Sequence, residues 1–434
     1  MPALEKPYHR RETSPYFFYP MFHPKKDRLS GNDAAVFYES LDNKCKKGTR
    51  CEVYIHIPFC DSFCHMCACY KTHTPRDKSI LKQYVDQLKR EIGRYSKKTY
   101  VQSLDMESVY FGGGTPSVLT PDMIEDLLCF TKDHLPVKKN TEITFEGDVR
   151  TLKDRYRLTA LRNSGCNRIS FGVQTFNPLS RKLSGLVPTK DEILRCIEVL
   201  KDLDYRINFD IMYGLPSQNL SVFKEDLNTA MEVGADGLDL YETVLYPTTK
   251  LFQLRHSRDL PDGDERMEML SFALGFLREQ GFRQKSRAIF QKKNNFCRKL
   301  AVDTYFCPDT LAIGDSAIGC MNDFAYRNDS PLMEYMDWKD PKVLPLRLGL
   351  KLDQHDRYTR RILSLARNLT LNKKRFWKEI DYFKDAIQKL EQNGLVAENA
   401  HQLYLTDVGR LWTDNIITDL ISTQQKMRSW KIIY

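Results

Sequence analysis

The chain has 434 residues, of which 41% are hydrophobic and 28% are charged, and its formal net charge is +9. This is a globular composition, long enough for two or three domains, and it excludes a low-complexity or solenoid-repeat protein. Lys and Arg are spread along the chain without a basic block, so the charge predicts no nucleic-acid partner. No apolar run approaches the roughly 18–20 residues of a transmembrane helix. Residues 1–6 are polar and lack a signal-peptide core, so we expect a cytoplasmic protein.

Residues 1–50 are rich in aromatic, proline and charged residues, most of all at 16–22. This composition predicts an irregular arm before the first domain. Two roles fit it: packing over one end of that domain, or covering a substrate as a lid.

From residue 51 onward, strand-like and helix-like segments alternate. The expected strands are 51–57, 107–111, 141–146, 167–173, 205–213 and 236–243. The expected helices are 78–96, 121–134, 151–163, 189–203, 219–233 and 265–281. Repeated β–α units predict a parallel sheet, open or closed as a partial barrel, with working residues at the carboxyl ends of the strands.

Cys60, Cys64 and Cys67 follow the first expected strand directly, in a C-x3-C-x2-C pattern. Three thiolates on one loop can hold three corners of a [4Fe–4S] cluster, which normally takes four cysteines, and leave one iron open for a ligand that is not protein. Zinc, with Cys69 as a fourth ligand, and unrelated cysteines remain alternatives. The chain's 12 cysteines are scattered, so we do not expect a disulfide framework.

Later strands also end in residues suited to ligand binding. The second ends in Gly112, Gly113 and Gly114, where backbone amides can approach a ligand closely. The third ends at Glu146, whose carboxylate could accept hydrogen bonds from a ribose or ammonium, or be salt-bridged. Polar residues also close the next two apolar runs, which points to a shared site at one edge of the sheet.

The pattern changes after about residue 345. Helices at 353–368 and 373–392 precede the turn Asn393–Gly394, a strand at 402–405 and a helix from 407 to 421. This order predicts a small winged-helix-like unit. We favour a cap on the substrate cavity over a DNA-binding role, because no basic recognition face stands out.

Taken together, these motifs resemble the HemN-type radical S-adenosylmethionine (SAM) enzymes, whose best-known members are oxygen-independent coproporphyrinogen III dehydrogenases. The matching segments are 54–60 with Cys64, Cys67 and Cys69, then 112–116, 172–177 and 210–216, with 405–411 near the C-terminus. The resemblance implies an α/β fold: a partial (β/α)6 barrel at 51–345 and a small winged-helix-like α+β cap at 346–434, after the arm at 1–50.

The resemblance also implies the cofactors. Cys60, Cys64 and Cys67 would ligate a [4Fe–4S] cluster, and SAM bound at the open iron would be cleaved to a radical that abstracts hydrogen. Family members hold two SAM molecules. By position the first would contact Tyr54, Gly113, Glu146 and Ile318. The second would contact Met66, Gly114, Thr115, Gln174, Asp210 and Val244. Cys69 matches a family cysteine that is not a ligand, so it is a catalytic candidate, although it could simply pack.

Three departures from the dehydrogenases bear on the substrate. Leu186 stands where those enzymes have an arginine that faces the second SAM, and Met66 replaces an aromatic residue. Residues 303–310 do not match their histidine- and aromatic-rich segment. The SAM machinery is kept, and the parts specific to porphyrinogen are altered.

These departures favour a class C radical SAM methyltransferase acting on an sp2 carbon of a planar substrate, either the menaquinone ring or a tetrapyrrole such as heme. Oxidative decarboxylation of coproporphyrinogen III is the alternative, and a heme chaperone on the same scaffold is a second alternative. A flavodoxin- or ferredoxin-type protein would supply electrons. If the substrate is menaquinone, the basic charge fits a peripheral contact with an anionic membrane.

Overall fold

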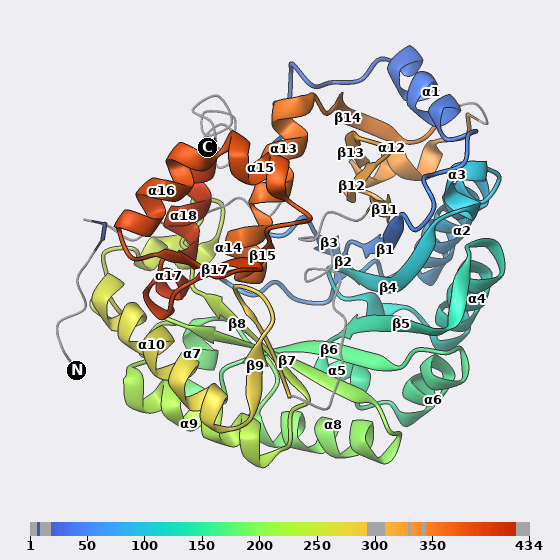
Figure 1. The fold of residues 1–434 in the computed structure, drawn as a ribbon. Helices are drawn as coiled ribbons and strands as arrows, with labels where there is room; N and C mark the ends of the chain where they lie inside the picture. The colour runs from blue at the N-terminus through green and yellow to red at the C-terminus, as the bar shows by residue number, and fades with distance from the viewer. Residues whose placement is uncertain (1–6, 9–18, 293–308, 329–330, 341–342, 422–434) are drawn as a thin grey trace.

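The computed structural model describes residues 7–8, 19–292, 309–328, 331–340 and 343–421, and its centre is a twelve-stranded sheet (Figure 1). Tyr16, Phe17 and Phe18 of the arm, and residues 303–308, lie outside the described residues. Neighbouring parallel strands form the middle of the sheet, and each matches a strand expected from the sequence. These strands are β1 (Arg50–Ile57), β4 (Asp105–Gly113), β5 (Val137–Gly147), β6 (Arg168–Gln174), β7 (Arg206–Tyr213) and β8 (Gly237–Glu242).

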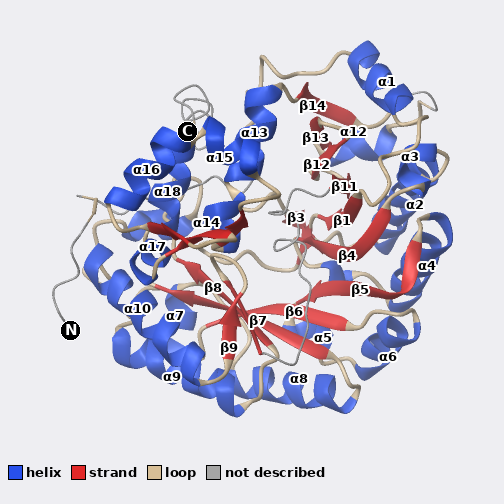
Figure 2. Cartoon of the chain, viewed as in Figure 1, coloured by secondary structure: helices blue, strands red, loops and turns tan. Residues whose placement is uncertain are grey.

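Helices cover the outer side of this curved sheet, as Figure 2 shows by colour. The larger ones are α2 (Lys78–Tyr95), α4 (Pro121–His134), α6 (Arg155–Asn163), α8 (Lys190–Asp202), α9 (Leu220–Glu232) and α10 (Gly263–Glu279). Shorter helical segments lie between them: α3 (Thr99–Gln102), η1 (Pro116–Val118), α5 (Val149–Leu152), α7 (Pro178–Leu183) and η2 (Lys250–Leu254). The predicted partial barrel is therefore confirmed.

The ends of these helices follow from side-chain capping. At α8, Thr189 and Glu192 form a capping box, in which each side chain accepts a hydrogen bond from the other residue's backbone N–H. At α2, the Asp77 side chain accepts from the Ser79 N–H. Along α2, Leu81, Leu88 and the residues between them at helical spacing are buried against the sheet.

Both edges of the sheet are extended by strands that the sequence did not reveal. Beside β1 lie β11 (Asp309–Ile313), β12 (Ile318–Met321), β13 (Phe324–Asn328) and β14 (Leu346–Lys351), of which only β11 pairs in parallel with its neighbour β1. Beyond β8 lie β10 (Ile289–Lys292) and β9 (Phe282–Gln284), both antiparallel. The sheet thus continues to Lys351, past residue 345. Helix α12 (Leu332–Asp337) connects β13 to β14.

The C-terminal segment is helical with a small antiparallel sheet, as predicted. Its strands are β15 (Thr370–Asn372), β17 (Gln402–Leu405) and β16 (Val396–Glu398), in that spatial order. Its helices are α13 (Gln354–Ile362), α14 (Ser364–Asn368), α15 (Trp377–Tyr382), α16 (Lys384–Gln392), α17 (Asp407–Leu411) and α18 (Thr413–Leu420). Each long helix expected here is two shorter ones, and Leu369, the residue after α14, has a left-handed φ of 66°. In Figure 1 the curved sheet is open on one side, with these helices at one edge of the opening and β11–β14 at the other.

The described end of the arm packs onto the protein. Tyr19 and Phe22 are buried, and Phe22 belongs to an apolar group with Cys320, Leu348 and Leu352. The Tyr19 hydroxyl donates a hydrogen bond of 3.1 Å to Asp356 at the start of α13. This part of the arm therefore has the packing role, and it is followed by helix α1 (Gly31–Ser40). Among the described residues, no helix combines the length and apolarity needed to cross a membrane.

Candidate active site at the strand ends

The cysteine loop is closed by two short strands that follow β1. β2 (Phe59–Cys60) pairs in parallel with β3 (Thr72–His73), so the loop begins and ends at neighbouring backbone positions. Within it the Cys67 N–H donates to the Cys64 carbonyl at 3.2 Å. The loop is also tied to the turn after α7, because the His65 N–H donates to the Ser184 carbonyl at 3.0 Å.

The thiols of this loop lie in distinct electrostatic environments. Burial raises the pKa of Cys60, and it raises the pKa of Cys64 to about 11. A hydrogen bond from the Cys69 thiol lowers the pKa of Cys67 to about 5, and the same bond raises the pKa of Cys69 well above its usual value. Lys71 adds a positive charge here, and its ammonium donates to the carbonyls of Cys67 and Cys69 at 2.8 and 3.1 Å.

This donor set fits an iron–sulfur cluster. Cys60, Cys64 and Cys67 lie close enough for each to influence the ionisation of another. A cluster is ligated at several irons rather than at one, so thiols spaced along one loop suit it better than they suit zinc.

Beside the loop, Glu146 joins the ends of β4 and β5. Its carboxylate accepts a hydrogen bond from the Gly113 N–H at 3.3 Å and another from the Tyr110 hydroxyl. Tyr54 of β1 lies on the same side, since a Cβ built on Gly112 would be 3.1 Å from both the Tyr54 ring and the Glu146 carboxylate. The structure thus brings together Tyr54, Gly113 and Glu146, three of the residues that the family resemblance assigns to the first SAM.

The turn after β4 has no room for side chains. A Cβ on Gly114 would lie 2.7 Å from the Phe59 carbonyl oxygen, and Gly113 has a φ of +116° with the His56 ring 2.6 Å from its Cβ position. Next to them, the Thr115 hydroxyl is 3.4 Å from the Cys60 sulfur. The glycine turn therefore packs directly against the start of the cysteine loop.

Gln174 ends β6 with a left-handed φ of 65°. Its side-chain oxygen is buried and has no hydrogen-bond partner among the described residues, an arrangement that a ligand could complete. The turn that follows is held by Asp226 of α9, which accepts from the Thr175 hydroxyl at 2.7 Å and the Phe176 N–H at 2.6 Å. On β7, Asp210 lies near Asn208, whose amide is 3.5 Å away.

Met66 and Leu186, two of the positions where this chain departs from the dehydrogenases, lie in the same apolar group. Met66 packs with Met212, Leu215 and Leu251, and Leu186 and Cys64 border this group. The place of the missing arginine is thus occupied by an apolar contact next to the cysteine loop.

Two predicted residues are not joined to the others. Val244 follows β8, and no hydrogen bond or apolar group in the described part of the chain connects it to the strand-end residues above. Ile318 of β12 packs instead with the apolar group around Phe22.

The structure adds residues that the sequence interpretation missed. His56 Nδ1 is 2.9 Å from the Tyr54 hydroxyl, and burial lowers the pKa of His56 to about 4, so the ring is neutral. The two-residue period of β1 could have revealed it, because Tyr54 and His56 share one face. Tyr110 on β4 could have been found in the same way, and Lys71 had no sequence signal.

The sequence of this chain is similar to those of known proteins. The model of the radical SAM superfamily matches residues 54–230. A heme chaperone HemW from Buchnera aphidicola is 30% identical over 269 residues, which are 62% of this chain and 69% of that protein. The chain belongs to the HemN-like radical SAM family. Enzymes of this family use a [4Fe–4S] cluster and SAM.

Other HemN-like relatives match nearly the whole chain. An anaerobilin synthase from Escherichia coli O157:H7 is 27% identical and covers 94% of this chain and 95% of its own length. An oxygen-independent coproporphyrinogen III oxidase from Pseudomonas aeruginosa is 28% identical, covering 87% and 86%. The solved coproporphyrinogen III oxidase HemN from Escherichia coli superposes with a TM-score of 0.77 at 24% identity, over 93% of this chain and 96% of that one, which confirms the fold.

Proposed function

We propose that this radical SAM enzyme acts on a tetrapyrrole at the strand ends beside its cysteine loop. The observation that carries the proposal is that Glu146, Gly113 and Tyr54 lie close together beside a loop whose three cysteines suit a cluster. The relatives are named for anaerobilin, coproporphyrinogen III and heme, all tetrapyrroles. None of these names refers to a quinone, so a tetrapyrrole replaces menaquinone as the planar substrate.

In this proposal Cys60, Cys64 and Cys67 ligate the cluster, which supplies the electron that cleaves SAM. Glu146, with its carboxylate already held by Gly113 and Tyr110, would accept hydrogen bonds from the first SAM, near Tyr54. The unpartnered oxygen of Gln174 suits a donor group of the second SAM.

The remaining assignments rest on the family resemblance. Met66, Gly114, Thr115, Asp210 and Val244 belong to the second SAM site, and Ile318 to the first. Cys69, whose thiol is hydrogen-bonded to Cys67 at the loop, is the catalytic candidate.

We propose methyl transfer to an sp2 carbon as the reaction. Its support is the change of Leu186 and Met66 within one apolar group beside the cysteine loop, while the strand-end residues are kept. Oxidative decarboxylation is the second candidate, favoured by the oxidase relative that covers most of this chain. A heme-binding role without turnover is the third, favoured by the chaperone relative.

One experiment separates the three candidates. The reconstituted enzyme would be incubated anaerobically with dithionite, SAM labelled on its methyl group, and either heme or coproporphyrinogen III, and products identified by mass spectrometry. S-adenosylhomocysteine, 5′-deoxyadenosine and a labelled tetrapyrrole would establish methyl transfer. Deoxyadenosine and methionine with a decarboxylated porphyrinogen would establish oxidation. Heme binding without any SAM cleavage would favour the chaperone role and overturn the enzymatic proposal.

Further parts of the proposal concern organisation and partners. We infer an arm at 1–50, a barrel domain whose sheet extends the expected range 51–345 as far as Lys351, and a cap formed by the rest of the expected range 346–434, in a cytoplasmic enzyme. A flavodoxin- or ferredoxin-type protein would donate the electron. Peripheral membrane contact was tied to a quinone substrate, and a tetrapyrrole does not require it.

A further inference from the structure

A basic cleft opens on the C-terminal segment. It has a volume of about 520 Å³, within the usual range of small-molecule sites. Helices α13 and α15 and the turn before α15 supply its lining: Gln354, Arg357, Tyr358, Arg361, Arg375, Trp377, Lys378 and Glu379. Four of these residues are cationic and one is anionic, so the cleft attracts anions.

Two of the four cationic side chains have a polar partner nearby, and the other two form no ion pair within the described part of the chain. Arg361 forms an ion pair of 3.0 Å with Glu379, and Arg357 donates to the Leu352 carbonyl at 2.8 Å. Arg375 and Lys378 form no ion pair with any described residue. The cleft therefore carries two positive charges without a counter-charge in the described part of the chain.

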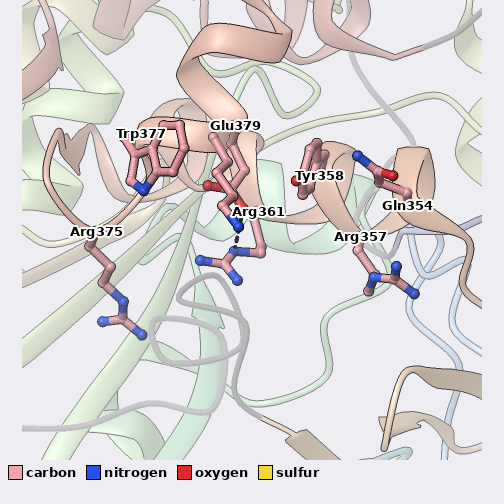
Figure 3. Close-up of a pocket in the computed structure, with 8 residues that line it drawn as sticks. Gln354, Arg357, Tyr358, Arg361, Arg375, Trp377 and Glu379 are labelled. Carbon is pink, nitrogen blue, oxygen red and sulfur yellow. Dashed lines mark ion pairs between the residues drawn. The ribbon is translucent and has the colours of Figure 1, made fainter.

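The guanidinium groups are held in place by a buried ring. The guanidinium carbons of Arg361 and Arg375 lie 5.2 and 5.3 Å from the centroid of Phe376, which is buried. Figure 3 shows the Arg357 and Arg361 side chains of α13 and the Arg375 side chain of the turn before α15 extending in the same direction. A planar, fixed guanidinium is the group best suited to bind a carboxylate with two parallel hydrogen bonds.

The cleft also offers an aromatic surface. Trp377 is 61% exposed, which is unusual for so large an apolar side chain, and the Lys378 ammonium lies 5.5 Å from its ring centroid. Exposed tryptophan beside unpaired cations matches a ligand with a flat apolar body and acidic groups at its edge.

The cleft adjoins the large sheet. Arg357 lies 3.9 Å from Asp323 in the turn between β12 and β13, and its neighbour Asp356 binds Tyr19 of the arm. We propose that this cleft binds the carboxylates of the planar substrate, with Arg375 and Lys378 as the specificity-determining cations. The inference rests on the proposed tetrapyrrole function, because tetrapyrroles such as heme combine a flat ring with propionate carboxylates.

A binding titration tests this inference without turnover. Full-length reconstituted protein, without SAM, would be titrated with protoporphyrin IX, which has two propionates, and with its dimethyl ester, and porphyrin fluorescence followed. The double variant Arg375→Gln/Lys378→Gln removes the two free charges. Its matched control is Lys374→Gln/Lys384→Gln, which removes two exposed charges of the same segment outside the cleft.

We expect the cleft variant to bind the diacid about tenfold more weakly, roughly 1.4 kcal/mol, with ester binding and the control unchanged. Equal affinity of wild type for diacid and ester, or an equal loss in the control, would overturn the inference. So would displacement of the diacid by millimolar inorganic phosphate, because the cleft would then be a phosphate site. If the tetrapyrrole is converted in the labelling experiment but the cleft variant binds normally, the cleft assignment alone fails.

Discussion

The Glu146 carboxylate at the end of β5 accepts a hydrogen bond from the Gly113 N–H at the end of β4, at 3.3 Å. This bond ties together two residues 33 positions apart in the chain. Because the Tyr110 hydroxyl donates to the same carboxylate, the group is oriented before any ligand arrives.

Glu146→Gln tests this carboxylate directly. The change keeps the size of the side chain but removes the charge that would bind SAM donor groups. We expect SAM to bind about tenfold to hundredfold more weakly, since a charged hydrogen bond contributes roughly 1.5–3 kcal/mol. Calorimetric titration of the reconstituted enzyme measures this. Glu125→Gln, on an exposed position of α4, is the control and should bind SAM normally. Unchanged affinity in Glu146→Gln would remove Glu146 from the SAM site.

Cys64→Ala should abolish the cluster and all cluster-dependent activity. Two thiolates cannot replace three, so the reconstituted variant should lose most of its iron and its visible absorption band. Iron analysis and anaerobic SAM cleavage are the measurements. Cys129→Ala, which changes a half-buried cysteine of α4, should leave both unchanged. Full turnover in Cys64→Ala would refute the cluster assignment.

Gly114→Ala should damage the turn between β4 and the cysteine loop. The new methyl group would lie 2.7 Å from the Phe59 carbonyl oxygen and 2.8 Å from the Pro58 carbonyl carbon, so the backbone must move. We expect the free energy of unfolding to fall by about 1–3 kcal/mol. Urea denaturation measures this loss. Gly93→Ala on α2 is the control, because its nearest neighbour would be 3.9 Å away and alanine favours a helix. Equal stability of the two variants would contradict the close packing of this turn.

Glu91 predicts a pH-dependent stability. It is fully buried on α2, where it accepts hydrogen bonds from the Gly314 N–H and the Tyr335 hydroxyl. Burial raises the pKa of Glu91 from 4.5 to about 7. Between these pH values the folded chain holds a proton that the unfolded chain has lost. The stabilisation of the fold by protonated Glu91 is therefore fully present below pH 4.5 and is lost as the pH rises through 7. The total loss in the free energy of unfolding is about 3 kcal/mol.

Urea unfolding at pH 5.5 and pH 8 would measure this effect. The wild type should lose more stability between these values than Glu91→Gln, which does not titrate. Parallel losses in the two proteins would show that Glu91 remains ionised in the fold.

The regular part of the fold was open to prediction because its signals are local. Strands such as β7 place apolar residues at alternate positions, here Ile207, Phe209, Ile211 and Tyr213, and capping residues such as Thr189 and Glu192 mark helix starts within four residues. The strands β11–β14 are short and mostly antiparallel, and β11 pairs with β1 across more than half the chain. No local pattern reports such a pairing, so these strands were missed.

In the candidate site the same distinction holds. His56 could have been found from the period of β1, and Lys71 contacts carbonyls of its own loop, but the contact of Met66 with Leu251 depends on how distant segments meet. The sequence also did not reveal that the expected helices at 353–368 and 373–392 are divided at Leu363 and Phe383. Leu369 adopts its left-handed conformation as the chain passes from α14 into β15.

By itself, the sequence determined that Cys60, Cys64 and Cys67 share one loop, because they are neighbours in the chain, and their spacing limits what they can bind. It also determined the order of β–α units, through apolar patterns a few residues long. Only the tertiary structure decided that Glu146 meets Gly113 and that Arg361 and Arg375 flank one buried ring. Such contacts join residues from separate elements, and strand register and helix packing set them through the sum of many weak interactions across the core.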